Sequence, residues 1–102
     1  MEMALTGDFM SAERAMSVGL INQIAPAGEA LAQAKALAAK IAENGPLAVK
    51  RSKQVIKESI DWSQDEMFAN QQEITSAVFS SEDAIEGATA FAEKRKPNWK
   101  GR

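Results

Sequence analysis

The sequence has neither cysteine nor histidine among its 102 residues. The lack of cysteine excludes disulfides and thiolate chemistry, and the lack of histidine removes the commonest general base and metal ligand. Its carboxylates mostly stand at the expected helix starts, so we expect no metal site. There is also no signal-peptide pattern and no apolar run of about 18 residues, the length that a membrane span needs. We therefore expect a cytoplasmic protein without a membrane partner.

Large apolar side chains are also in short supply. The apolar share of the composition is 45%, but much of it is alanine. Each buried alanine removes little area from water, so the core of a chain this size has a small volume. We expect one domain at most, with a core that needs an outside surface to complete it.

Charge is strongly segregated behind a net value of −2. Residues 50–60 carry +3, residues 61–93 carry −8 without a single base, and residues 94–102 carry +5. These blocks either pair with one another or leave two basic patches open to a phosphorylated ligand. A pI near 5.1 argues against nucleic acid as a partner.

Caps and apolar spacing predict helices along most of the chain. Gly7 ends a first helical turn, Ser11 caps a short helix, and Gly19 ends it. The longer helices are expected at residues 29–43, at 46–60, from 63 to 79, and from Ser81 to a last turn that holds Lys94, Arg95 and Lys96. The apolar stretch 20–24 fits an edge strand or an extended connection. The expected fold is an all-α small helical bundle with at most one short extended segment near residues 20–24.

Few side chains in these helices suggest chemistry. Ser63 and Glu66 fit a capping box. Adjacent acids such as Glu82 and Asp83 favour a helix start near the positive end of the dipole rather than a catalytic pair. Trp62 and Trp99 are expected to be packing anchors. The last helix is expected to present Ala84, Ala88 and Phe91 on its inner face.

Three segments, in this order, resemble the enoyl-CoA hydratase/isomerase (crotonase) superfamily. They are residues 5–22 (LTGDFMSAERAMSVGLIN), 43–53 (ENGPLAVKRSK) and 81–101 (SEDAIEGATAFAEKRKPNWKG). Family members are similar in having a spiral of ββα units followed by a C-terminal helical domain that drives trimer formation. The resemblance implies that this chain is the C-terminal portion only. Residues 1–27 would be the tail end of the spiral core, and residues 28–102 would be the helical oligomerisation domain.

The resemblance also implies where catalysis lies. The oxyanion hole and the two glutamates that family hydratases use come from the spiral. No position of this sequence matches them, so no catalytic residue is carried over and the chain alone is expected to be inactive.

One binding element of the family matches this sequence. In family enzymes the last helix of one subunit reaches the CoA site of its neighbour with an aromatic residue and a lysine, which by motif are Phe91 and Lys94 here. The other reading of these residues is that Phe91 is core and Lys94 is a cation that matches the helix dipole. The resemblance implies a CoA thioester as the substrate of the whole enzyme, no tightly bound cofactor, and at most weak acyl-CoA binding by this chain.

The preferred hypothesis is the C-terminal part of an enzyme that hydrates trans-2-enoyl-CoA in fatty acid metabolism and assembles as a homotrimer or a dimer of trimers. A second hypothesis is a free-standing helical association module. A third keeps the family but makes the whole enzyme an isomerase, a decarboxylase, a hydrolase or a dehalogenase.

Overall fold

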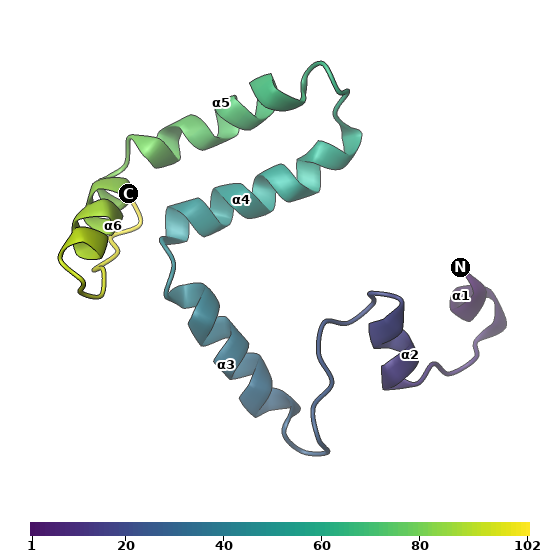
Figure 1. The fold of residues 1–102 in the computed structure, drawn as a ribbon. Helices are drawn as coiled ribbons and strands as arrows, with labels where there is room; N and C mark the ends of the chain where they lie inside the picture. The colour runs from purple at the N-terminus through teal and green to yellow at the C-terminus, as the bar shows by residue number, and fades with distance from the viewer. The chain divides into compact units, whose positions relative to one another are not determined.

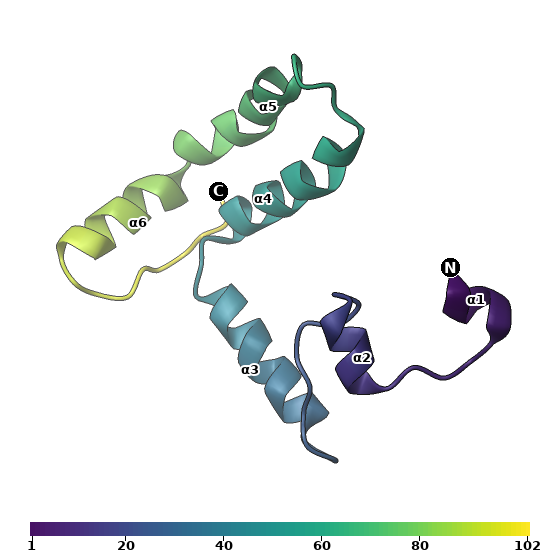
Figure 2. The same ribbon diagram turned by 45° about the vertical axis from the view of Figure 1, so that its right-hand side comes forward.

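The computed structural model describes residues 1–102 apart from the side chain of Glu2, and the regular structure in this part is entirely helical (Figures 1 and 2). The elements are α1 (Glu2–Thr6), α2 (Ala12–Ser17), α3 (Ala30–Ala42), α4 (Pro46–Glu58), the 3₁₀ helix η1 (Ser59–Asp61), α5 (Met67–Phe79) and α6 (Glu82–Ala92). Residues 20–24 form no strand. The all-α class expected from the sequence is confirmed.

The chain divides into two compact units, Met1–Ala38 and Ala39–Arg102. The first holds α1, α2 and most of α3, and the second holds the end of α3 and all later helices. The boundary expected near residue 27 concerns two parts of a longer enzyme, and it stays a prediction.

Most helix ends lie where the sequence places them. The Ser11 hydroxyl accepts a hydrogen bond from the Arg14 backbone N–H at 3.2 Å, as an N-cap does. Ser81 does the same for the N–H of Ala84 at 3.0 Å. Gly7, at the end of α1, has φ +74°, a left-handed conformation that side chains disfavour. The caps predicted at Ser11, Ser81 and Gly7 are therefore confirmed.

The start of α5 differs from the prediction. The helix begins at Met67, after a turn, rather than at Ser63. The Ser63 hydroxyl donates to Glu66 Oε2 at 2.6 Å, so these two side chains bond to each other. With both groups engaged, neither caps the backbone N–H groups that a capping box would satisfy.

The end and the inner face of α6 also differ. The helix ends at Ala92, so Lys94, Arg95 and Lys96 lie beyond it rather than in its last turn. Ala88 and Phe91, expected on the inner face, are exposed, whereas Asp83 and Ala90 are buried. The residues that follow α6 fold back over its polar side, and this contact determines which face is covered.

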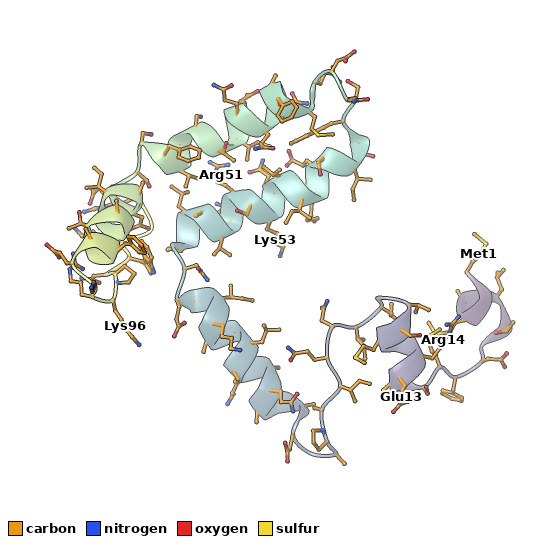
Figure 3. All side chains as sticks on the ribbon, viewed as in Figure 1. Met1, Glu13, Arg14, Arg51, Lys53 and Lys96 are labelled. Atoms are coloured by element: carbon orange, nitrogen blue, oxygen red, sulfur yellow. The ribbon has the colours of Figure 1, made fainter. Side chains whose placement is uncertain are left out.

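Helices α4 and α5 run antiparallel, side by side, in the second unit (Figures 1 and 2). Both helices carry half-buried apolar side chains: Leu47, Ala48 and Val55 on α4, and Ile74 and Val78 on α5. Figure 3 shows Arg51 on the side of α4 toward α5 and Lys53 on the opposite side. Lys50, Lys53 and Lys57, which belong to the basic block 50–60, are exposed on α4.

The described residues build almost no core. Ala15 and Ala90 are their only buried hydrophobic residues, and the exposed surface totals 8571 Å². A compact monomer of 11.0 kDa exposes about 5,600 Å², and two separate globules in the size ratio of the two units would expose about 6,700 Å². Many large apolar side chains are exposed, among them Ile56, Ile60, Phe68, Phe79, Ile85 and Phe91. None of the described helices has the length and hydropathy to cross a bilayer.

Candidate functional site

Phe91 and Lys94 lie together at the C-terminal end of α6. Phe91 is in the last turn and is 87% exposed, so it is not a core residue of the described chain. Lys94 is the second residue after the helix, and its side chain is exposed. Its ammonium has no ion pair or hydrogen bond within the part of the chain that the structure describes.

The backbone beyond α6 forms a Schellman turn. The N–H of Lys94 donates to the Phe91 carbonyl at 3.2 Å, and the N–H of Arg95 donates to the Ala90 carbonyl at 3.0 Å. Lys94 has φ +54°, the left-handed conformation in which glycine is usual at this position. Holding a residue with a Cβ there costs about 1 kcal/mol.

The Arg95 guanidinium, which follows this turn, binds two carboxylates. Its Nη1 and Nη2 donate to Glu86 Oε1 and Oε2 at 2.6 and 3.0 Å, and its Nε donates to Glu93 Oε2 at 2.6 Å. The Arg95 bonds and the Asn98 N–H lower the pKa of Glu86 to about 2, and Glu86 with Glu93 raises the pKa of Arg95. Glu86 and Arg95 therefore both stay charged at neutral pH.

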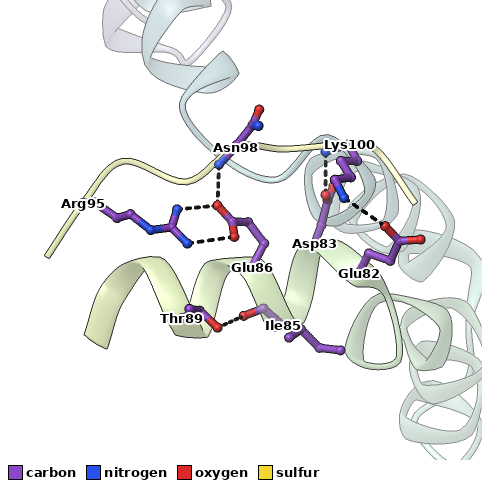
Figure 4. A pocket seen from close by; sticks show the side chains of 8 residues that line it. All are labelled: Glu82, Asp83, Ile85, Glu86, Thr89, Arg95, Asn98 and Lys100. Atoms are coloured by element: carbon purple, nitrogen blue, oxygen red, sulfur yellow. Dashed lines mark hydrogen bonds and ion pairs between the residues drawn. The ribbon is translucent and has the colours of Figure 1, made fainter. Parts of the chain in front are cut away.

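Residues 95–102, here called the C-terminal strap, fold back along α6 (Figure 4). The Asn98 N–H donates to Glu86 Oε1 at 2.7 Å. One helical turn earlier, the 5% exposed Asp83 accepts from the N–H groups of Lys100 and Gly101 at 2.7 and 2.9 Å. Successive carboxylates of α6 thus satisfy backbone donors of the strap, and their role is structural.

Trp99 anchors the strap to the turn between α3 and α4. Its Nε1–H donates to the Glu43 carbonyl at 2.9 Å. A Cβ built at Gly45 would lie 3.7 Å from the ring, and one at Gly87 would lie only 3.1 Å from it. The expectation that Trp99 is a packing anchor is confirmed, and glycine at position 87 lets α6 approach the ring.

The hollow beside α6 does not look like a ligand site. It measures about 420 Å³ and is lined by the residues labelled in Figure 4, which include neither Phe91 nor Lys94. Its acidic lining is engaged, because Glu82, Asp83 and Glu86 all bind the strap. No group of three or more candidate metal-ligating side chains occurs among the described residues.

Each of the two basic blocks lines a hollow that Trp99 also lines. One hollow of about 470 Å³ is lined by Lys50, Lys53 and Trp99, and another of about 490 Å³ by Arg95, Lys96 and Trp99. Of the two alternatives, pairing of the blocks occurs among the described residues only between α6 or Glu93 and the strap. The lysines of α4 form no ion pair within the described residues.

The strap contacts of Asp83, Glu86 and Arg95 are absent from the sequence prediction. The helix dipole already explains acids at the start of α6, so they were not expected to bind the strap as well. A usable signal was the spacing of Asp83 and Glu86, which puts both on one face, together with the basic segment after Pro97.

Comparison with known proteins agrees with this arrangement. The family model described as "Enoyl-CoA hydratase/isomerase" matches residues 1–102. Over 101 residues the chain is 43% identical to the enoyl-CoA hydratase EchA19 of Mycobacterium tuberculosis, covering 99% of this chain and 38% of that protein. Over 105 residues it is 40% identical to a carnitinyl-CoA dehydratase of Proteus mirabilis, covering 99% and 40%.

Solved structures give the same result. The crystal structure of an enoyl-CoA hydratase from Mycobacterium tuberculosis H37Rv superposes with a TM-score of 0.96 at 56% identity, over 99% of this chain and 40% of that one. The chain spans about 40% of the length of these relatives. With a family model that matches its whole length, the chain belongs to the enoyl-CoA hydratase/isomerase family.

Proposed function

We propose that this chain is the C-terminal helical part of an acyl-CoA enzyme, and that the whole enzyme hydrates a trans-2-enoyl-CoA in the cytoplasm as a step of fatty acid metabolism. In this proposal the chain contributes subunit association and part of the CoA site, and it has no catalytic activity of its own. The proposal draws on the names of the relatives, which are hydratases or dehydratases of CoA thioesters.

The observation that carries the proposal is the exposed apolar surface. The exposed surface exceeds that of two separate globules by about 1,900 Å², and obligate interfaces bury roughly 1,000–2,500 Å² on each partner. Large apolar side chains in this quantity are stable in water only when another surface covers them. The remainder of the enzyme and neighbouring subunits, in a homotrimer or a dimer of trimers, would provide that cover.

The proposed CoA contact is the end of α6. Phe91 offers an uncovered aromatic face, and Lys94 offers an ammonium without an internal partner. A lysine binds phosphate as a compact point charge, and an aromatic ring supports a flat apolar group such as a nucleotide base. Because both side chains are exposed and no enclosed cavity surrounds them, acyl-CoA binding by this chain alone would be weak.

Two measurements on the purified 102-residue chain test this proposal. Addition of crotonyl-CoA should give no hydration above a buffer control, and turnover would refute the assignment of catalysis to the rest of the enzyme. Sedimentation over a concentration series should show self-association, because the exposed apolar faces have no other cover in that sample. A chain that stays strictly monomeric at high concentration would count against an association role.

A further inference from the structure

Lys94 occupies a backbone conformation that its side chain disfavours. It is the one non-glycine residue with positive φ among those described, and it stands where a Schellman turn usually has glycine. Strained backbone persists only where the surroundings determine it, and such strain is concentrated at functional sites. If position 94 only had to form this turn, glycine would form it with less backbone strain than lysine.

The surroundings that hold this turn are specific. Arg95, the next residue, forms a two-pronged pair with Glu86, which is 23% exposed in its side chain. The same Glu86 oxygen accepts from the Asn98 N–H, so one carboxylate fixes the chain on both sides of Pro97. The planar guanidinium suits this geometry, and a lysine could not reproduce it.

Because Arg95 binds these carboxylates, the neighbouring Lys94 is left without an anionic partner in the part of the chain that the structure describes. Arg95 engages both Glu86, in the middle of α6, and Glu93, the residue that follows the helix. Lys94, three residues after the exposed Phe91, therefore keeps an ammonium with no partner among the described residues. An external anion is the partner that such an ammonium lacks.

We propose that the Glu86–Arg95 pair is a positioning device that holds Lys94 in its left-handed turn and keeps its ammonium available for a phosphate of the CoA ligand. The proposal rests on the proposed function, in which Lys94 contacts CoA. In it Glu86 and Arg95 do not touch the ligand and act through Lys94. If Lys94 is only a cation that matches the helix dipole, changes at Glu86 and Arg95 should not affect ligand binding.

The test is a titration of the ¹⁵N-labelled 102-residue chain with coenzyme A, followed by NMR, with circular dichroism as a check on helicity. Lys94→Gly should weaken binding about fivefold and raise the midpoint of thermal unfolding by about 4 °C, because glycine relieves the strain. Glu86→Gln should weaken binding about threefold and shift the backbone couplings of residue 94. The matched control is Glu82→Gln, which also breaks ion pairs to the strap but should leave affinity unchanged.

The double variant isolates the positioning role. In the Lys94→Gly background, Glu86→Gln should cause no further loss of affinity, since its effect passes through Lys94. An equal loss in both backgrounds, or unchanged affinity in Glu86→Gln alone, would overturn the positioning role and leave the CoA contact standing. Unchanged affinity in Lys94→Gly would overturn the CoA contact and this inference with it.

Discussion

At the scale of single residues, carboxylates on α6 determine the path of the C-terminal strap. Asp83 and Glu86 accept backbone N–H groups of the strap, and Glu86 also accepts the Arg95 fork. A bidentate pair with arginine fixes direction as well as distance. The segment beyond Pro97 is therefore held by side-chain acceptors on α6 and by the Trp99 bond to the Glu43 carbonyl, and it forms neither a strand nor a helix.

Acid should release the strap in a defined pH range. The pKa of Glu86 falls from its ordinary 4.5 to about 2 in the folded chain, so its ionised form stabilises the fold above pH 4.5. That stabilisation is lost as pH falls from about 4.5 toward 2. Trp99 fluorescence and the Asn98 amide shift should follow this loss, because both residues lie on the strap.

Two variants separate Glu86 from the other acids. Glu86→Gln should remove the part of the acid transition that belongs to this pair and leave a weaker dependence of stability on pH. Glu73→Gln changes an acid without an ion pair in the described structure and should keep the wild-type profile. Identical profiles for Glu86→Gln and the wild-type chain would contradict this account.

At the scale of the elements, the close approach of α6 to Trp99 depends on Gly87. Glycine within a helix costs about 1 kcal/mol relative to alanine, so Gly87→Ala would stabilise α6 if nothing opposed it. The added Cβ would meet the Trp99 ring at 3.1 Å, and the hydrogen bond to Glu43 restrains the ring from withdrawing. We expect a net destabilisation of about 1 kcal/mol, measured by urea unfolding.

A second background reverses the sign of this effect. With Trp99→Ala, the obstacle is gone, and Gly87→Ala should stabilise the chain by up to about 1 kcal/mol through helix propensity. Stabilisation by Gly87→Ala in the wild-type background would show that the ring moves freely. The strap would then not be anchored as described.

Local sequence signals predicted the helices well where one residue and its neighbours decide. Ser11, Ser81 and Gly7 satisfy or relax backbone groups within a few residues of themselves, so their roles can be read from spacing. The helix start predicted at Ser63 was wrong, because the Ser63 hydroxyl bonds to the Glu66 side chain and caps no backbone N–H. The strap contacts join α6 residues to partners as many as eighteen positions later in the sequence, and rules based on near neighbours do not specify such partners.

At the scale of the whole molecule, the expectation of a core that needs an outside surface agrees with the exposure found. The abundance of alanine explains part of it, because small side chains bury little area. The rest comes from large residues such as Phe68 and Phe79, which are 78% and 81% exposed. Helical spacing alone identified an apolar face and could not tell whether anything in the chain covers it.

Candidate site residues were accessible to sequence reasoning only through the family resemblance. Nothing in composition or spacing distinguishes Phe91 from a core residue, and its 87% exposure appears only in the structure. The left-handed turn at Lys94 is equally hidden, since lysine is an unfavourable residue for it. The positions came from the motif, whereas the backbone conformation came from the structure.

The central claim, that this chain completes an acyl-CoA enzyme, is tested most directly by a chimera. In it, the chain replaces the matching 40% of the Mycobacterium tuberculosis enoyl-CoA hydratase whose structure it resembles at 56% identity. The measurement is the hydration rate of crotonyl-CoA, with the truncated relative and the 102-residue chain as separate controls. The account predicts that the chimera hydrates crotonyl-CoA while both controls are inactive. A chimera that folds but does not turn over, or an active truncated relative, would contradict it.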